Sequence, residues 1–419
     1  MLPRPIQSVL ATLVALLALP ILLWRRKTRR GLAQRLGHLP PPPARDGPRL
    51  WIHAASAGDV KNAWPVVRAL KEARPSLTVL LTYVTNSAEQ MVGTLSPPPD
   101  VHAYAPLDAP LFVRRALDAW RPAVLLLEMT ELWPALVAQA RARGVSVALC
   151  NGRMSPRSAA RYAMLFGWLT NPVPALAVLC LQTDADRTRY LALGASPERA
   201  FVTGNCKFDA AARTPSPEKV AALRGVVGER GPLLCAGSTH AGEEDVVVGA
   251  LAAARGVVPG CRLLWAPRYL EHVDGLMALC LSRGWRVARR SAGAVTCAAA
   301  DVVILDTMGE LAAAYALAQV ALVGGSWVPR GGQNILEPAA QGVPVLHGPH
   351  MFLAPDQVEV LDGHGARLVN RGELPAAVVH WFTHDNDARR EGEAGRAAVS
   401  AVAGAAARHT EHLLPLLPS

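Results

Sequence analysis

Residues 233–251 read LLCAGSTHAGEEDVVVGAL, and this stretch holds the pattern that decides the fold. Four apolar residues at 233–236 predict a buried strand, and the small and hydroxyl-bearing residues after them predict a tight turn. The apolar spacing of residues 243–254 predicts a helix. A strand, a turn and a helix in this order form the repeating unit of a parallel α/β sheet.

The same unit recurs along the chain, before and after this stretch. Helices are predicted at 59–73 and 132–143, and strands at 50–54, 77–82, 121–127, 145–149, 177–183, 200–203, 263–267, 302–305, 320–323 and 344–346. Strands that alternate with helices indicate crossover connections and parallel sheets. We therefore expect an α/β protein with doubly wound, Rossmann-like domains, whose ligands bind beyond the carboxyl ends of the strands.

The length of 419 residues favours two such domains. A Pro-rich linker, PPPPARDGP, occupies 40–48, and a second, TPSP, occupies 214–217. We expect a membrane anchor with its basic flank at 1–30, an N-terminal domain at 45–209 and a C-terminal domain at 218–419. The last of these includes an Ala-rich helix predicted at 389–412.

The N-terminus carries the signal for membrane attachment. Residues 9–24, VLATLVALLALPILLW, contain no charge and are slightly shorter than the roughly 20 residues that span a bilayer. The basic residues that follow favour a cytoplasmic location for the rest of the chain: Arg25, Arg26, Lys27, Arg29, Arg30 and Arg35. The alternatives are a helix that lies on the membrane surface and a cleaved signal peptide, whose basic residues would precede the apolar core.

The formal net charge of +10 is consistent with acidic small molecules, anionic lipids or nucleic acid as partners. The basic cluster directly follows the apolar segment, and no nucleic-acid motif is present, so we expect anionic membrane lipids and no nucleic acid. The seven cysteines form no CxxC pair and are odd in number. We interpret them as reduced, buried thiols of a cytosolic domain.

Acidic side chains follow two strands of the first half. In HAASAGD (53–59), Asp59 is placed either to cap a helix or to act as a general base, and Ser56 and Gly58 share its turn. Glu128 and Glu131 follow the apolar run at 124–127. Two neighbouring acids raise each other's pKa, which makes the pair a candidate for a functional site. The alternative is that one acid caps a helix and the other is solvated.

Basic candidates follow the later strands of this half. Arg153 comes after the strand at 145–149 and is suited to phosphate or carboxylate groups, as is Arg157. Lys207, in GNCKFD (204–209), stands just before the second linker, where it can meet an anion or simply be solvated. A surface role is the alternative for each of them.

In the second half, small, polar or charged residues follow successive strands. Ser238, Thr239 and His240 lead into a helix and predict an anion-binding corner. Glycine-rich turns let the backbone approach a phosphate or a ribose, and a following Glu can accept hydrogen bonds from ribose hydroxyls. Further candidates for such a nucleotide site are Pro267, Arg268, Met308, Gly309, Glu310, Ser326, Asn334, Ile335, Leu336 and Glu337.

Two nucleotide motifs are missing from the sequence: it has no GxxxxGK[ST] loop and no GxGxxG that opens a helix. A DxD pair, Asp184 and Asp186, could hold a metal, but it precedes two arginines and is more typical of a helix cap. We therefore expect neither a metal nor a cofactor.

These runs together resemble the Kdo transferase family, whose members add 3-deoxy-D-manno-octulosonic acid to a lipid A precursor. The similarity lies in the serial order of TELWP (130–134), NGRMS (151–155), GNCKFD, GSTHAGEE (237–244), GEL (309–311), GGS (324–326) and GGQNILEP (331–338). It implies a GT-B fold with two domains that face a cleft, a CMP-Kdo donor, a lipid A precursor as acceptor, and inversion at the anomeric carbon without a metal. It also implies an enzyme at the inner membrane.

By this resemblance Asp59 is the catalytic base, and Glu131 (or Glu128) and Lys207 stabilise the transition state. The CMP site would comprise Pro267, Arg268, Met308, Gly309, Glu310, Asn334, Ile335, Leu336 and Glu337.

The chain departs from the family pattern in three places. The family has a glutamate where this chain has Asp59, and its ETELWP reads MTELWP here, with the acid displaced to Glu128. Two histidines of the family are replaced by Tyr269 and Gln333. A transferase for another nucleotide sugar, or a weakly active homologue that acts as a membrane binding protein, are the alternatives.

Overall fold

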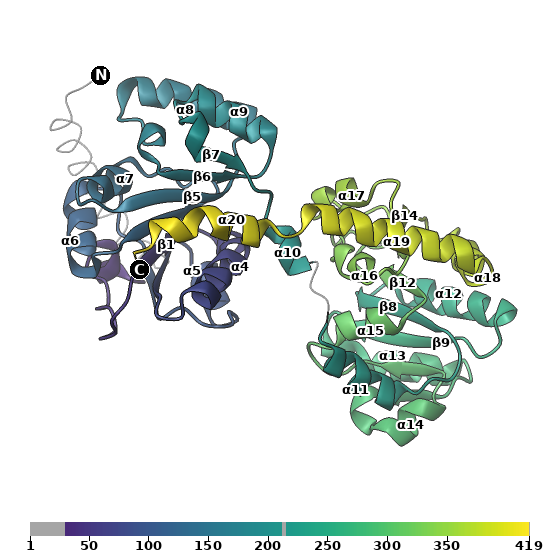
Figure 1. The fold of residues 1–419 in the computed structure, drawn as a ribbon. Coiled ribbons are helices and arrows are strands. Elements are labelled where there is room, and N and C mark those ends of the chain that lie inside the picture. The colour runs from purple at the N-terminus through teal and green to yellow at the C-terminus, as the bar shows by residue number, and fades with distance from the viewer. Residues whose placement is uncertain (1–29, 212–214, 419) are drawn as a thin grey trace. The chain divides into compact units, whose positions relative to one another are not determined.

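The computed structural model describes residues 30–211 and 215–418, which form two compact α/β units (Figure 1). The first unit takes the chain up to Ala210 together with Gly404–Ser419, and the second takes Ala211–Ala403. The predicted anchor at residues 9–24 lies outside the described residues. Within the described ranges, no helix combines the length and the hydropathy needed to cross a membrane.

The first unit is built on a seven-stranded sheet in which every strand is parallel to its neighbours. The spatial order is β3-β2-β1-β4-β5-β6-β7, so the strand order reverses between β1 and β4. The strands are β1 (Arg49–His53), β2 (Thr78–Tyr83), β3 (Val101–Tyr104), β4 (Val124–Glu128), β5 (Ser146–Gly152), β6 (Val178–Leu181) and β7 (Ala200–Val202).

Helices cover both faces of this sheet (Figure 1). They are α3 (Leu32–Arg35), α4 (Ala57–Ala73), α5 (Asn86–Val92), α6 (Pro110–Trp120), α7 (Pro134–Arg141), α8 (Pro156–Trp168), α9 (Asp184–Ala192) and α20 (Ala405–Leu413). The short α10 (Lys207–Ala211) belongs to the segment that leads into the second unit. Because successive strand residues point to opposite faces, Trp51 and Leu125 enter one core cluster and Ile52 and Leu126 the other. Burial on both faces explains the continuous apolar runs of the sequence.

The second unit repeats this architecture with a parallel sheet in the order β10-β11-β9-β8-β12-β13-β14. Its strands are β8 (Leu233–Thr239), β9 (Arg262–Pro267), β10 (Val287–Arg289), β11 (Val302–Ile304), β12 (Val320–Val323), β13 (Val345–His347) and β14 (Ala366–Leu368). Its helices are α11 (Pro217–Val227), α12 (Glu244–Val257), α13 (Val273–Ser282), α14 (Ala294–Ala299), α15 (Leu311–Leu317), α16 (Leu336–Ala340), α17 (Pro355–Leu361), α18 (Leu374–Thr383) and α19 (Asp385–Val402).

The C-terminal segment corrects two expectations. The helix predicted at 389–412 is two helices, α19 and α20, separated at Gly404, which has a φ of 79°. Left-handed backbone of this kind suits glycine and ends a helix. Because α20 packs on α4 of the first unit, the domain expected at 218–419 ends at Ala403.

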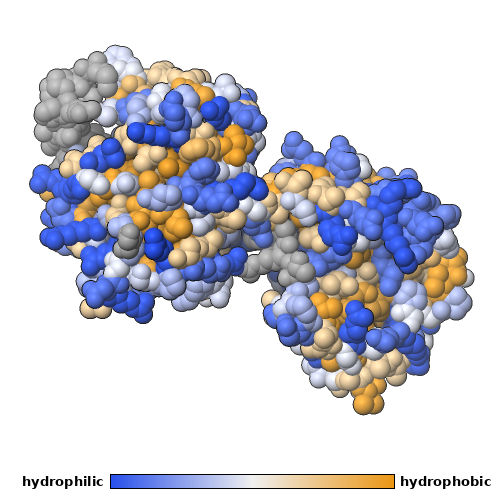
Figure 2. All heavy atoms as spheres, in the orientation of Figure 1, coloured by the Kyte–Doolittle hydropathy of each residue, from blue (hydrophilic) through white to orange (hydrophobic). Residues whose placement is uncertain are grey.

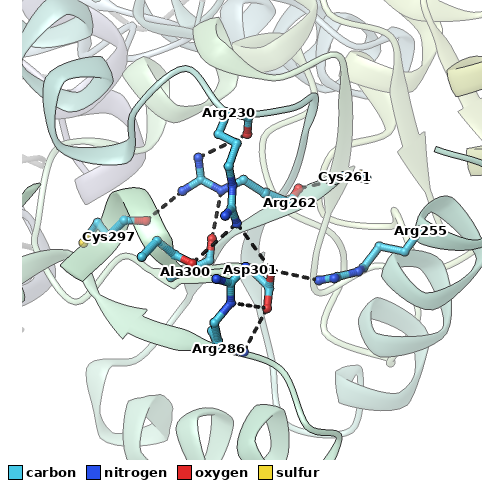
Figure 3. Close-up of polar contacts among 9 residues, drawn as sticks. Arg230, Arg255, Cys261, Arg262, Arg286, Cys297, Ala300 and Asp301 are labelled. Atoms are coloured by element: carbon cyan, nitrogen blue, oxygen red, sulfur yellow. Dashed lines mark hydrogen bonds and ion pairs between the residues drawn. The ribbon is translucent and has the colours of Figure 1, made fainter. Parts of the chain in front are cut away.

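At the amino end of β11, Asp301 is surrounded by arginines (Figure 3). Arg286 donates to both of its oxygens, at 3.2 and 3.0 Å, and Arg230 and Arg255 lie within 3.5 Å. Arg262 is buried beside it and donates to the carbonyls of Ala300 and Cys297. Burial opposes ionisation, but the arginines outweigh it and lower the pKa of Asp301 to about 2.

Candidate functional site

The first unit gathers its acidic candidates at the carboxyl ends of β1 and β4. Ser56 caps α4, and Asp59 is the third residue of that helix. The Asp59 carboxylate accepts from the backbone N–H of Ser56 at 2.9 Å, and its own N–H donates to the Ser56 hydroxyl at 3.3 Å. Asp59 therefore does cap its helix. The half-buried carboxylate lies just beyond the end of β1, and the adjacent Gly58 is exposed.

Glu128 ends β4 and is completely buried. Its carboxyl group contacts the thiol of Cys150 at 2.9 Å and accepts from the Asn151 amide at 3.1 and 3.2 Å. Burial raises the pKa of Glu128 to about 8, and the negative charges of Asp59 and Glu131 act in the same direction. Glu128 is therefore a neutral acid at pH 7, and the negative charges of Asp59 and Glu131 favour this neutral form.

Glu131 lies on the loop after β4 and is partly exposed. It accepts a 2.6 Å hydrogen bond from the Trp133 indole, and the buried His53 ring lies 3.7 Å away. Burial acts to raise the pKa of Glu131, but the contacts with His53 and Trp133 outweigh it and lower that pKa. The two glutamates therefore differ in protonation, with Glu131 ionised and Glu128 neutral at pH 7.

The remaining first-unit candidates follow β5 and β7. Arg153 is exposed just before α8, and Lys207 begins α10 directly after the buried Cys206. The backbone N–H of Cys206 donates to the Asn151 side chain at 2.9 Å, which joins the Lys207 loop to Glu128. His53 and Asn151 also belong to this edge of the sheet, but no local sequence pattern marks either of them as a site residue.

The DxD pair lies in the first turn of α9, at the helix N-terminus that the sequence favoured for it, although neither aspartate is the capping residue. Thr183 caps α9, and Asp186 is buried, accepting from the Thr183 hydroxyl at 2.6 Å and the Met154 N–H at 2.7 Å. Among residues 30–211 and 215–418, no group of three or more metal-binding side chains comes together.

In the second unit, a buried glutamate holds two candidate loops together. Glu243 accepts from the backbone N–H groups of His240, Gly325 and Trp327 at 2.8–2.9 Å. Ser238 has a φ of 55°, and a Cβ on Gly324 would lie 2.4 Å from the Thr239 backbone. The ends of β8 and β12 therefore approach so closely that only glycine fits there.

Arg268 follows β9 at the same edge. Its backbone N–H donates to the Thr239 carbonyl at 2.8 Å, and its guanidinium lies 5.6 Å from the centre of the Tyr269 ring. The Tyr269 ring meets His240 edge to face at 5.6 Å. An arginine, an imidazole and an exposed aromatic ring thus lie together beside Pro267, a set suited to a phosphate and a flat base.

Met308, Gly309 and Glu310 form the turn after β11. Met308 is 79% exposed and Gly309 has a φ of 81°, while Glu310 pairs with Arg290 at 2.9 Å and with the Thr307 hydroxyl. The turn therefore presents its backbone and the Met308 side chain to solvent, while Arg290 holds the glutamate in place.

The last candidates lie around the short helix α16. Asn334 accepts from the Leu336 N–H at 3.1 Å. Glu337 lies near Cys235 and Tyr315, and its charge adds to the burial that raises the pKa of both groups. Ile335 and Leu336 are completely buried, and their N–H groups donate to the side chains of Gln357 and Asn334, so neither residue faces solvent. Ser326 is also buried and bonds the Val323 carbonyl at 2.5 Å and the Gly348 N–H at 2.8 Å, which is a structural role.

Comparison with known proteins identifies the family. A family model described as 3-deoxy-D-manno-octulosonic-acid transferase (kdotransferase) matches residues 30–210. The 3-deoxy-D-manno-octulosonic acid transferase of Bordetella pertussis is 35% identical over 412 residues, which cover 93% of this chain and 94% of that protein. That of Haemophilus influenzae is 32% identical, covering 93% and 92%. The chain belongs to the Kdo transferase family.

Membership makes the chain a glycosyltransferase of lipopolysaccharide biosynthesis. The UDP-GlcNAc 2-epimerase of Neisseria meningitidis matches 88% of this chain and 100% of its own with a TM-score of 0.55 and 12% identity, which shows a shared fold. The structure shows where two of the residues that depart from the family's sequence pattern lie. Asp59 is held by the capping box of α4, and Glu128 is buried below the loop that carries Glu131.

Proposed function

We propose that the chain transfers Kdo from CMP-Kdo to a hydroxyl group of a lipid A precursor, with inversion and without a metal. The observation that carries this proposal is the set of carboxyl groups at one sheet edge, in which Asp59 and Glu131 flank the protonated Glu128. Separating the protonation states of neighbouring acids in this way suits a site for proton removal.

In the proposed reaction Asp59 takes the proton of the acceptor hydroxyl, whose oxygen attacks the anomeric carbon of Kdo. The bond from that carbon to the CMP phosphate breaks, and CMP leaves with the electron pair. A single displacement of this kind inverts the anomeric carbon. Lys207 and Glu131 stabilise charge as it develops, and Arg268 meets the phosphate of CMP.

The second unit supplies the donor site in this proposal. The exposed Gly309 and the partly exposed Ser238 and His240 can offer backbone to a nucleotide, and Tyr269 offers a ring for cytosine. The donor must reach Asp59 of the first unit, which is the arrangement that a GT-B enzyme provides with its two domains.

The first unit offers an apolar groove for the lipid acceptor. A cavity of about 330 Å³ lies beside the Glu131 loop and is lined by Val84, Ala105, Leu107, Leu132, Trp133 and Pro134, with Arg35 and Asp108 as its charged residues. Mostly apolar walls with few charges suit part of a phosphorylated lipid.

Helix α8 fits the proposed location on an anionic membrane at the cytoplasmic side, where the N-terminal segment would also attach. Met164 and Trp168 are 69% and 70% exposed, Arg157 and Arg161 are exposed on the same helix, and Arg153 lies just before it. Figure 2 shows apolar and hydrophilic side chains close together over the region of α8. No acidic residue occurs between Glu131 and Asp184. Basic and aromatic residues on one helix favour a negatively charged lipid surface.

Transfer of labelled sugar tests this function. The full chain is incubated with CMP-Kdo and a lipid A precursor, in parallel with other nucleotide sugars. Transfer of Kdo supports the proposal. Transfer only from another nucleotide sugar, or CMP binding without any transfer, would contradict it.

A further inference from the structure

Every polar group of Asn151 is engaged, and its partners belong to different parts of the first unit. This residue is the last but one of β5 and is completely buried, with a φ of 49°. A left-handed backbone is costly for most residues and is tolerated by Asn. A buried residue in such a conformation points to a positional requirement.

The Asn151 side chain links three segments. Its amide donates to both oxygens of Glu128 at the end of β4, and to the carbonyl of Asn62 in α4 at 3.3 Å. Its side-chain oxygen accepts from the N–H of Cys206 at 2.9 Å. These segments carry the proposed catalytic residues, because Asp59 lies one turn before Asn62, Glu131 follows Glu128 and Lys207 follows Cys206.

The Asn151 backbone links two further segments. Its carbonyl accepts from the side chain of Gln182, at the end of β6, at 2.9 Å. Its N–H donates to Nε2 of His409 in α20, also at 2.9 Å. Gln182 also accepts from Asn205 at 3.2 Å, and Asn205 accepts from the N–H of Lys207, so the Lys207 loop is held from two sides.

The protonation state of His409 suits its role as the acceptor of the hydrogen bond from the Asn151 N–H. Its Nδ1 lies 2.7 Å from the carbonyl of Ala405, which can only accept, so the ring proton belongs on Nδ1 and Nε2 is the acceptor. Burial lowers the pKa of His409 to about 4, which keeps the ring neutral at pH 7. His409 therefore accepts permanently from Asn151.

Helix α20 is itself tied to the Lys207 loop. The carboxylate of Asp209 accepts from the N–H groups of Gly404, Ala405 and Ala406 at 2.5–3.2 Å and caps the helix. Arg408 donates to the Thr203 carbonyl at 2.9 Å. The C-terminal helix and the Lys207 loop are therefore coupled at both the cap and the His409 contact.

We propose that Asn151 and His409 are positioning residues that set the relative placement of Asp59, Glu131 and Lys207, which makes α20 a working part of the transfer site. The inference rests on the proposed function for those three residues. Neither Asn151 nor His409 touches substrate in this proposal; both act through the segments that they join.

The test compares variants of His409 in the full chain. Glutamine can place an acceptor where Nε2 lies, whereas asparagine reaches only the Nδ1 position and leaves the Asn151 N–H unpaired. His412→Phe is the matched control, because His412 lies on the same helix and stacks on Phe201 at 3.8 Å, a contact that Phe keeps.

We expect His409→Asn to lower kcat on the order of 10- to 100-fold with an unchanged KM for CMP-Kdo, the size expected for a displacement of about 1 Å at the reacting groups. His409→Gln should restore kcat to within about fivefold of wild type by returning the acceptor. Amide hydrogen exchange at residues 203–209 and 128–133 should quicken in His409→Asn and stay unchanged in His412→Phe.

The inference is overturned if His409→Asn matches His412→Phe in kcat and in exchange. It is also overturned if glutamine restores nothing that asparagine loses. Should the wild type transfer no Kdo, the proposed function fails, while the exchange comparison still decides whether His409 holds these segments. If His409→Asn does not fold, Asn151→Asp, which replaces the amide donor facing Glu128, carries the same comparison.

Discussion

The Asp59 carboxylate accepts a hydrogen bond from the backbone N–H of Ser56, so the proposed base is also half of a helix capping box. The two roles use one carboxylate and can be separated by substitution. Asparagine keeps an oxygen that accepts from Ser56 but cannot remove a proton at neutral pH. Alanine loses both functions.

Asp59→Ala should therefore lower the free energy of unfolding by about 1 kcal/mol, the usual value of a capping interaction. Asp59→Asn should lower it by less than about 0.5 kcal/mol. Urea unfolding measures both, with Asp184→Ala as a control, because Asp184 lies exposed in the first turn of α9. Equal losses for alanine and asparagine would show that the capping contact contributes nothing.

Glu128 should make the protein less stable at alkaline pH. Its pKa of about 8 lies above its ordinary value, so the contribution of Glu128 to stability is greatest below pH 4.5 and falls as the pH rises toward 8. Glu128→Gln keeps the shape without the charge and should gain stability relative to wild type as the pH rises, by on the order of 4 kcal/mol at pH 8. Unfolding midpoints at pH 5 and pH 8 check this, and an advantage that does not grow with pH would contradict it.

Asp301 has the opposite dependence. Its pKa of about 2 lies below the ordinary 3.8, so its stabilising effect is complete above pH 5 and is lost as the pH falls through about 2. Asp301→Asn should cost about 2 kcal/mol at pH 7. Asp274→Asn, which breaks an exposed pair with Arg289, should cost less than about 0.5 kcal/mol. Similar losses for the two variants in urea unfolding would disprove a special role for the arginine cluster.

Helix α8 should enter the interface of an anionic membrane. All seven native cysteines are buried, so a cysteine introduced by Met164→Cys can be labelled selectively with an environment-sensitive dye. Vesicles of phosphatidylglycerol and phosphatidylcholine should shift its emission to the blue, and phosphatidylcholine alone should not. Leu281→Cys, at a 60% exposed position of α13, is the control. An equal shift at both positions would contradict docking through α8.

The central strands could be predicted from sequence because burial on both faces gives uninterrupted apolar runs. The edge strands β3, β10 and β14 were missed, since each has only three or four residues and mixes polar with apolar ones. The end of β5 was also placed too early, because its last residues, Cys150 to Gly152, include polar Asn151 in a left-handed conformation.

The candidate site residues also differ in whether a local sequence pattern predicts their positions. The positions of Asp59, Glu128 and Arg268 at strand ends could be predicted, because ligands of parallel sheets bind beyond the carboxyl ends of the strands, and their roles stay predictions. His409 could not, because it lies 258 residues from Asn151, and no local pattern reports such a contact. The burial of Ser326 and Leu336 was likewise invisible, since glycine-rich turns look alike whether they face a ligand or the core.

The most direct test of the account is the rate of Kdo transfer from CMP-Kdo in single turnovers by wild type, Asp59→Asn and Asp59→Glu. If Asp59 is the base, asparagine should slow transfer on the order of 100-fold or more with CMP binding intact, and glutamate should match or exceed the wild type. Transfer by Asp59→Asn at the wild-type rate, or its complete loss in Asp59→Glu, would contradict the central claim.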